Sequence, residues 1–533
     1  MKGVVVAPEP PAADAGREIL AAGGNAADAA VAAALAQCVV NPLMVGIGGM
    51  GTMYVHCGRT GAGAALDCCA EAGSVPPPER WIADYAGREE TYGRYMTSED
   101  FQIGYPSVMV PGVVRGCGEL WRRFGSQRIA WARLVEPAAR LARDGFEIYP
   151  YVRRSWDDDY PAKAVPTLAR RWAQFPEGAR IYGRAPAVGE RFVQPDYART
   201  LERIAGGGPD EFYAGGLGRA IADDLERGGS LITRADLERY RTLTPPPVRG
   251  RYRDLEVAGA APPASTSQVI GMLQIAAGFD WHALDPTGPD AIELIAKIMR
   301  VGFYEHVPMK GDPPYAVTAH RLHEFTRPEH AARWIERIKA GHRVYNEGTS
   351  RMDAGTTHVT AADAEGTVVA FTHSTGTPGA SGIVTPGLGF LYNHFLGHFN
   401  PLPGHPDSIL PGKRGGGGSP IVVYRQGRPY LALGAPGGSR IITACFQTIV
   451  NVVERGLGIQ EAVAAPRCHS EERNIIFLEP SHPAATEVEL VRRGYDVRRS
   501  TRMSTVQAVL IDEAERRHPG ADPRGGQGVG AVA

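Results

Sequence analysis

An alanine-rich stretch near the N-terminus constrains the fold more than any other feature. Residues 12–38 carry mostly small apolar side chains, and Gly23, Gly24 and Asn25 interrupt their helical pattern. Because side chains this small let a helix approach its neighbours closely, we expect a broken helix that packs against a sheet. Residues 4–7, which precede it, read as a short buried strand.

Charge and composition exclude several classes of protein. The 533 residues include 57 basic and 58 acidic side chains, for a net charge of −1. This balance gives no electrostatic reason to bind nucleic acid or an anionic membrane, and we expect neither partner. A hydrophobic content of 43% argues against disorder. We therefore expect a loop-rich globular enzyme.

The cysteine pattern and the N-terminus predict the compartment. The seven cysteines include no CxxC pair, so we expect buried free thiols rather than a zinc or redox motif. His320, His323 and His330 lack the spacing of metal ligands on a helix. The N-terminus has no apolar signal-peptide core, and the apolar stretch 29–40 is too short to span a bilayer. We expect a cytoplasmic protein.

A glycine motif at 46–51 superficially resembles a dinucleotide-binding loop. Gly46, Gly48 and Gly51 match GxGxxG, and Asp67 follows at a suitable distance. The nucleotide motif, however, needs a strand before the glycines and a helix after them. Here the expected order is reversed, so we interpret the motif as a tight turn between a helix and a strand.

The C-terminal part changes to strands. Residues 356–363 and 367–374 alternate with period two around a turn at Glu365 and Gly366, which predicts a hairpin. Residues 421–434 predict a second hairpin, and 439–455 a helix after it. The residues from 110 to 240 and from 267 to 304 read mainly as helices. Strands followed by helices in both halves predict packed layers of sheet and helix.

Thr356 is the candidate nucleophile. It starts a predicted strand after the small residues Ala354 and Gly355. A threonine within a chain has no base of its own, but cleavage before it would create an α-amino group with a pKa of about 7.7–8.0. This amine can accept the hydroxyl proton. The pattern TTH is also compatible with an ordinary strand.

A glycine-rich turn offers the second catalytic element. Pro436, Gly437, Gly438 and Ser439 stand between a predicted strand and a predicted helix. Unpaired backbone N–H groups at such a helix start could bind an oxyanion, and glycines would let a substrate carbonyl approach them. A plain strand-to-helix turn is the alternative, but it needs only one glycine.

Together these segments resemble the γ-glutamyltranspeptidase family of N-terminal-nucleophile hydrolases. The resemblance covers nearly the whole chain and rests on motifs that occur in the family's order. They are GGNAADAAVAAALAQCVVNP at 23–42, GIGGMGTMYVH at 46–56, YPSVMVPGVVRG at 105–116, ARDGF at 142–146, TTH at 356–358, GIVTPGLGFLYN at 382–393, GAPGGSRI at 434–441 and AAPRCH at 464–469.

The resemblance implies a four-layer αββα sandwich of the α+β class and a proenzyme that cuts itself between Gly355 and Thr356. It implies a large subunit of residues 1–355 and a small subunit of 356–533, which stay together as a heterodimer in one interleaved domain. Thr356 would be both the processing residue and the nucleophile, supported by the hydroxyl of Ser374. Gly437 and Gly438 would form the oxyanion hole of an acyl-threonine pathway.

The carboxylate-binding positions depart from the family pattern. The family binds the substrate α-carboxylate with an arginine in its N-terminal third, where this chain has Pro78, with Arg80 two residues later. A serine pair of the family is also missing, because the loop here reads Lys413, Arg414 and then four glycines. Arg80, Lys413 and Arg414 are the candidates to bind a carboxylate in its place.

The ammonium-binding positions depart as well. An asparagine and an acidic segment of the family meet the substrate α-amino group, whereas this chain has Gly376 and the segment YNHFLGHF. Asn393 is kept, but Phe395 and His398 replace polar or acidic positions. Charged hydrogen bonds are worth about 1.5–3 kcal/mol each, so losing two or three weakens binding at least roughly a thousandfold.

The sequence therefore predicts intact catalytic machinery with glutathione as a poor substrate. The main interpretation is a self-processing threonine hydrolase or acyltransferase that cuts an amide-type, γ-glutamyl-like bond. The partners would be a small-molecule acyl donor and a water or amine acceptor, and the chemistry requires no metal or organic cofactor. The alternatives are the same chemistry on an oxamate-like, dicarboxylate-monoamide, cephalosporin-type or carbon–carbon substrate, or an inactive binding protein.

Overall fold

The computed structural model describes residues 2–88, 95–157, 164–304, 325–344, 355–405, 407–471 and 473–532. His320, His323 and the residues directly before Gly355 lie outside these ranges, so their predictions stay untested. Within the described ranges, no helix is long and apolar enough to cross a membrane. All seven cysteines are described; they are buried and free, as predicted.

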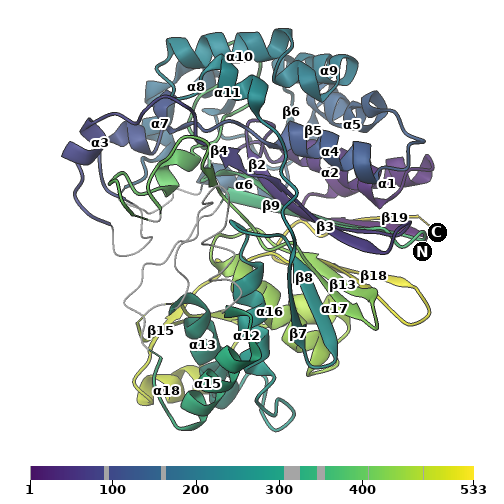
Figure 1. The fold of residues 1–533 in the computed structure, drawn as a ribbon, viewed down its shortest axis with the longest axis vertical. Helices are drawn as coiled ribbons and strands as arrows, with labels where there is room; N and C mark the ends of the chain where they lie inside the picture. Colours follow the sequence, from purple (N-terminus) through teal and green to yellow (C-terminus); the bar gives the residue numbers. More distant parts are fainter. Residues whose placement is uncertain are drawn as a thin grey trace.

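Two six-stranded antiparallel sheets form the centre of the molecule (Figure 1). The strands of the first sheet are β1 (Gly3–Ala7), β2 (Met50–Cys57), β3 (Ala62–Cys68), β9 (Gly355–Asp363), β10 (Val368–Gly376) and β19 (Gly528–Val532). They pair in the order β19-β1-β9-β10-β2-β3. The chain ends therefore lie side by side, on neighbouring strands (Figure 1).

The second sheet is built from strands that lie later in the chain. They are β7 (Val248–Tyr252), β8 (Leu255–Gly259), β12 (Ile421–Arg425), β13 (Arg428–Gly434), β17 (Gln507–Ile511) and β18 (Arg517–Ala521). Their order is β18-β17-β13-β12-β8-β7. The two sheets pack face to face around small and β-branched side chains, among them Val4, Val6, Ala362, Val422 and Val509.

Helices cover the outer face of each sheet (Figure 1). On the side of the first sheet lie α1 (Pro10–Ala21), α2 (Ala26–Val40), α4 (Val113–Phe124), α5 (Trp131–Asp144), α9 (Pro195–Gly207) and α10 (Gly216–Arg227). On the side of the second lie α12 (Thr266–Ala276), α13 (Pro289–Tyr304), α15 (Pro328–Lys339), α16 (Arg440–Val453), α17 (Ile459–Ala464) and α18 (Ala484–Arg492). The predicted four-layer αββα sandwich is confirmed.

Shorter elements connect and edge these layers. The short helices are α3 (Arg80–Ala83), α6 (Pro150–Asp157), α7 (Leu168–Gln174), α8 (Pro176–Tyr182) and α11 (Arg234–Arg239). The remaining named strands pair as β4 (Ala70–Glu71) with β11 (Arg414–Gly415), as β5 (Phe146–Glu147) with β6 (Arg191–Phe192), and as β15 (Ile475–Leu478) with both β14 (Cys468–His469) and β16 (Asp496–Arg499).

The alanine-rich stretch forms two helices, as its glycine break predicts. Asn25 begins α2 with a capping box, in which its side chain accepts from the backbone N–H of Asp28 at 3.0 Å. Every residue of α2 is buried, because the helix is enclosed by α1, α5, β9 and β10. Small side chains make this enclosure possible, and they bring α2 directly behind the strand that begins at Gly355.

The glycine turn at 46–51 follows α2 and leads into β2, which confirms the order that excludes a dinucleotide site. A side chain at Gly48 would overlap the backbone carbonyl of Leu391. The motif thus permits a close approach between the turn and residues 391–392, where Gly48 pairs with Tyr392 in an isolated bridge.

Candidate active site

Thr356 lies at the start of β9 with its side chain between the two sheets. Side chains alternate along a strand, so Thr356, His358 and Thr360 share one face. His358 packs against Gly434 of β13, and the Thr360 hydroxyl donates to the Gln507 carbonyl of β17 at 2.9 Å. Both partners are residues of the second sheet, so this face of β9 points toward the space between the sheets. Thr356 is only 6% exposed.

Two hydroxyl groups meet at the carbonyl oxygen of Gly355. The Thr356 Oγ1 atom lies 2.7 Å from this oxygen and 3.2 Å from the Ser374 Oγ atom. The Ser374 hydroxyl donates to the same oxygen and accepts from the Gly376 N–H at 3.0 Å. The candidate nucleophile therefore lies beside the peptide bond that joins Gly355 to Thr356, with a second donor on its carbonyl.

A register shift in β10 lies next to this pair of hydroxyl groups. His373 pairs with Thr357, but the next pair is Gly376 with Gly355. The pairing up to His373, continued by one residue, sets Ser374 opposite Thr356, so the two side chains share one face of the sheet. Gly376 adopts φ +112°, and a Cβ atom there would overlap the ring of His394. Glycine is required at 376 for both reasons.

The hydrogen bonds of His394 define its protonation. Its Nδ1 atom lies 2.9 Å from the Gln102 carbonyl, which can only accept, so Nδ1 carries the hydrogen. Its Nε2 atom accepts from the Thr377 N–H at 2.8 Å. The imidazole packed against Gly376 is therefore neutral, and both of its nitrogens are occupied.

His358 is a buried support rather than an accessible base. Thr360 uses its hydroxyl hydrogen on Gln507, so the His358 Nε2–H donates to Thr360 at 2.9 Å. The Nδ1 atom then accepts from the Thr372 hydroxyl at 2.8 Å. Burial lowers the pKa of His358 to about 3, since desolvation disfavours the charged ring. The ring stays neutral at ordinary pH.

A buried acid behind the sheet was not foreseen from the sequence. Thr357 points away from Thr356, toward the helices, and its hydroxyl lies 2.9 and 3.0 Å from the two carboxyl oxygens of Glu9. Gln37 and Asn41 of the α2 region donate to the same carboxyl group at 2.6 and 2.8 Å. The available signal was an acidic residue next to a buried strand, which is unusual.

The glycine pair at 437–438 follows the end of β13. Gly437 and Gly438 have φ of +125° and +62°, so both positions favour glycine, and α16 starts directly afterwards at Arg440. Gly434, three residues before Gly437, contacts His358 of β9. The loop thus leaves β13 from the strand end that covers the Thr356 side of β9. Its predicted role as an oxyanion hole stays a prediction.

The three basic candidates for carboxylate binding already have partners. Arg80 is exposed and pairs with Asp100. Lys413 is buried, and its Nζ atom donates to the Ser408 carbonyl at 3.0 Å. The Lys413 ammonium group therefore binds a backbone carbonyl of the protein.

Arg414 is the most enclosed of the three. It lies 3.4 Å from the Asp67 carboxylate and 3.1 Å from that of Glu71, and it also donates to the backbone carbonyls of Asp67 and Arg241. Its guanidinium stacks on the ring of Tyr240. This set of partners indicates that Arg414 joins β11 to the first sheet.

The predicted ammonium-binding residues are also engaged. The Asn393 amide donates to the carbonyls of Gly48 and Met109, both at 2.8 Å, and its oxygen accepts from the Met109 N–H at 3.1 Å. His398 packs against the rings of His394 and Phe395. Asn393 therefore fixes backbone segments, and Gly376 contributes no side chain.

Apolar groups lie next to the hydroxyl pair. Met50 of β2 is opposite Ser374 of β10, so the two side chains share the inner face of the sheet. The glycine loop at 415–418 packs onto this region, with Gly416 against Met50 and Gly418 against Thr372. Met50 also belongs to a cluster with Phe395 and Phe399. The surface beyond Ser374 is thus apolar.

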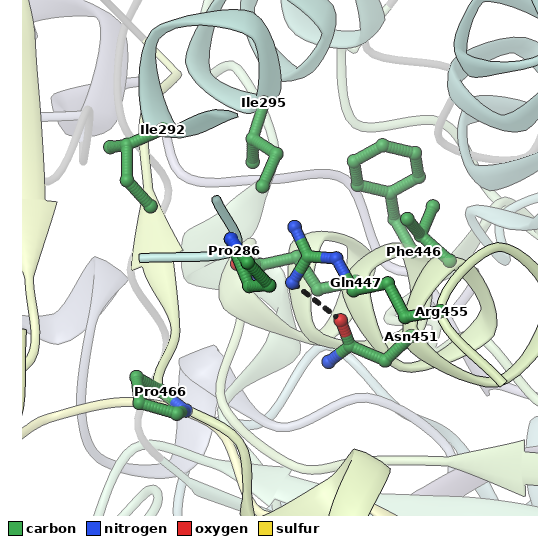
Figure 2. Close-up of a pocket in the computed structure, with 9 residues that line it drawn as sticks. Pro286, Ile292, Ile295, Phe446, Gln447, Asn451, Arg455 and Pro466 are labelled. Carbon is green, nitrogen blue, oxygen red and sulfur yellow. Dashed lines mark hydrogen bonds between the residues drawn. The ribbon is translucent and has the colours of Figure 1, made fainter. Parts of the chain in front are cut away.

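A separate cavity lies between helices of the second sheet's outer layer (Figure 2). It is lined by Ile292 and Ile295 of α13 and by Phe446, Gln447 and Asn451 of α16, with Arg455 beside them. Its volume of about 10 Å³ suits about one water molecule. It includes no residue that the sequence placed in the catalytic site. Among the described residues, no cluster of His, Cys, Asp or Glu could hold a metal ion.

Comparisons with known proteins place this geometry in context. A family model described as gamma-glutamyltranspeptidase matches residues 12–532. The Acylase ACY 1 proenzyme of Pseudomonas sp. (strain SE83) is 36% identical over 510 residues, covering 94% of this chain and 88% of that protein. The glutathione hydrolase proenzyme of Pseudomonas aeruginosa is 31% identical over 556 residues, covering 99% and 94%.

Solved structures agree with the sequence comparisons. The crystal structure of cephalosporin acylase from Bacillus halodurans has a TM-score of 0.85 to this chain at 26% identity. The match covers 100% of this chain and 96% of that one. Relatives with different names, acylase and glutathione hydrolase, thus both match this chain over nearly its whole length.

Proposed function

Because the chain belongs to the gamma-glutamyltranspeptidase family, we propose that it is a self-processing threonine hydrolase or acyltransferase with Thr356 as its nucleophile. The observation that carries this proposal is the position of Thr356 Oγ1, 2.7 Å from the Gly355 carbonyl oxygen and beside the Ser374 hydroxyl. The proenzyme names of the relatives support a maturation step.

Self-cleavage would begin with attack of Thr356 Oγ1 on the Gly355 carbonyl carbon. The Ser374 hydroxyl, which already donates to this carbonyl oxygen, would stabilise the oxyanion. The C–N bond would break as the Thr356 nitrogen takes up the hydroxyl proton, leaving an ester that water then hydrolyses. The products are fragments of 355 and 178 residues (533 − 355), the second beginning with a free amine at Thr356.

Turnover would reuse the same hydroxyl. The new α-amino group, whose ordinary pKa is about 7.7–8.0, is partly neutral near pH 7 and can accept the Thr356 hydroxyl proton. Attack on an amide carbonyl would give a tetrahedral oxyanion near the backbone N–H groups of Gly437 and Gly438. Collapse would release the amine and leave an acyl-threonine, which water or a second amine resolves.

For the acyl group, we favour one that carries no α-ammonium. Gly376 has no side chain, His394 beside it is neutral, and the Asn393 amide is committed to backbone groups. A γ-glutamyl group would thus lose charged contacts worth about 1.5–3 kcal/mol each. The acylase relative at 36% identity supports this direction. A dicarboxylate monoamide is the simplest donor of this kind, and glutathione would be a poor one.

Intact-mass analysis of freshly purified protein tests the chemistry. We expect two fragments, the smaller beginning at Thr356, and a single uncut chain for Thr356→Ala. A wild-type chain that stays uncut after long incubation would contradict the proposal.

A matched pair of chromogenic amides tests the substrate class. Glutaryl-p-nitroanilide and γ-glutamyl-p-nitroanilide differ only in the α-ammonium group. We expect kcat/KM to be at least tenfold higher for the glutaryl compound. The reverse order would show that the ammonium is recognised, by groups other than Gly376 and Asn393.

A further inference from the structure

The side of β9 that faces α2 holds polar groups that the proposed reaction does not use. The carboxyl group of Glu9 and the amide of Gln37 are both fully buried there. Glu9 has no basic side chain among its hydrogen-bond or ion-pair partners in the described part of the chain; its partners are Gln37, Asn41 and Thr357. Burying an acid in this way is unfavourable, and desolvation raises its pKa.

This buried group contacts the residue next to the nucleophile. The Thr357 hydroxyl donates to the Glu9 carboxyl group and accepts from Gln37 Nε2 at 2.9 Å. Gln37 Nε2 also lies 3.1 Å from the His358 carbonyl. Gln37 therefore contacts two consecutive residues of β9, Thr357 and His358, from the side of the sheet that faces α2.

The same glutamine reaches the neighbouring strand. Its Oε1 atom accepts from His373 Nε2 at 2.9 Å. His373 is paired with Thr357 and directly precedes Ser374. Thus Glu9 and Gln37 hold one residue next to Thr356 and one next to Ser374, the two hydroxyl groups that lie 3.2 Å apart.

We propose that Glu9 and Gln37 are positioning residues that set the separation of the Thr356 and Ser374 hydroxyls through Thr357 and His373. This inference rests on the proposed function of Thr356. Neither residue touches the scissile carbonyl, so they act on reaction geometry and not on bond making. The expected signature is a loss of rate without a loss of substrate affinity.

Thr357→Val tests the proposal, because valine keeps the shape of threonine and removes only the hydroxyl. We expect self-cleavage to slow at least tenfold and, in the fraction that matures, kcat to fall by a similar factor with KM within twofold. Thr357→Ser keeps the hydroxyl, so its cleavage rate and kcat should both stay within threefold of wild type. Glu9→Gln should also slow cleavage. The new amide NH₂ group cannot accept a hydrogen bond, so the N–H donor of Gln37 or of Asn41 would lose its acceptor.

Thr200→Val is the matched control. Thr200, in α9, is as buried as Thr357, and its hydroxyl donates one hydrogen bond, to the Leu388 carbonyl at 2.9 Å. The valine variant removes this hydrogen bond. We expect it to lower the Tm comparably and to leave cleavage unchanged. Thr357→Val cleavage and kcat within twofold of wild type, or equal slowing by Thr200→Val, would overturn the proposal.

Amide hydrogen exchange separates this inference from the proposed function. In a Thr356→Ala background, which removes cleavage, adding Thr357→Val should accelerate exchange in the peptide 355–363 at least tenfold, and adding Thr200→Val should not. An uncut wild-type protein would refute the proposed function alone. Unchanged exchange in 355–363 would refute the positioning role alone.

Discussion

The hydroxyls of Ser374 and Thr356 lie 3.2 Å apart and point at one carbonyl oxygen, that of Gly355. One group can attack while the other stabilises the charge that develops. Because the Gly376 N–H donates to Ser374, the Ser374 hydroxyl hydrogen is free to face the carbonyl. Under the proposed mechanism, Thr356 is the attacking group and Ser374 the stabilising one.

Ser374→Ala should slow self-cleavage by about 10²–10³-fold, which is the usual effect of removing one oxyanion donor. The substitution leaves Thr356 in place, so cleavage should remain detectable over days. The measurement is the fraction of the 178-residue fragment against time. Cleavage at the wild-type rate would show that the Ser374 hydroxyl does not stabilise the oxyanion.

Gly376→Ala should block maturation by distorting the end of β10. The new Cβ would overlap the His394 ring, and φ of +112° is unfavourable for alanine. Gly427→Ala is the control, because Gly427 has φ +78° but open space around it. We expect the control to lower stability by about 1 kcal/mol and to mature normally. Equal maturation of both variants would exclude a role for the His394 contact.

Local patterns predicted the layers of the fold and the hairpin that carries Thr356 and Ser374. Period-two alternation identified β9 and β10, and the glycines before α2 identified the helix break. What the sequence could not show is the register shift between His373 and Gly376, which places Gly376 opposite Gly355. A bulge is a property of two paired strands, and neither strand's own sequence specifies it.

Contacts between distant residues were equally hidden. Glu9 meets Thr357 across 348 positions of the chain, and Arg414 meets Glu71 across 343. The family resemblance made Arg414 a candidate for substrate binding, because it lies in the loop where the family has its carboxylate-binding serine pair. Its partly buried acidic partner Glu71 becomes visible only when β4 and β11 pair.

Stability should fall as the pH drops below 6.5, because His358 and His373 are buried as neutral rings with pKa values lowered to about 3. Above pH 6.5 both folded and unfolded chains hold these rings neutral, so their contribution is fully present. Between pH 6.5 and 3 the unfolded chain binds protons that the folded chain does not. Each ring then lowers the free energy of unfolding by roughly 1 kcal/mol per pH unit.

Urea unfolding of wild type and His373→Gln at pH 7.5, 6.5 and 5.5 measures this slope. The variant should be less stable than wild type at pH 7.5, because it loses the buried hydrogen bond from the His373 ring to Gln37. Its loss of stability between pH 6.5 and 5.5 should nevertheless be smaller than that of wild type. Identical slopes would mean that His373 is not a neutral buried ring.

Arg414 and Arg80 provide a direct test of which arginine supports the fold and which is available to a substrate. Arg414→Met should destabilise the protein by about 3–5 kcal/mol, because it removes a buried guanidinium that pairs with the buried Asp67 carboxylate and the partly buried Glu71 carboxylate. Arg80→Met removes an exposed pair with Asp100 and should cost under about 1 kcal/mol. Urea unfolding checks both values.

The KM of the matured variants decides the second half of this prediction. If Arg80 binds the carboxylate of a glutaryl-type donor, Arg80→Met should raise KM about tenfold or more and leave kcat and the urea midpoint nearly unchanged. Arg414→Met assayed well below its unfolding midpoint should keep the wild-type KM, since its guanidinium is already surrounded by protein acceptors. A raised KM for Arg414→Met alone would reverse the assignment and make Arg414 the carboxylate-binding residue.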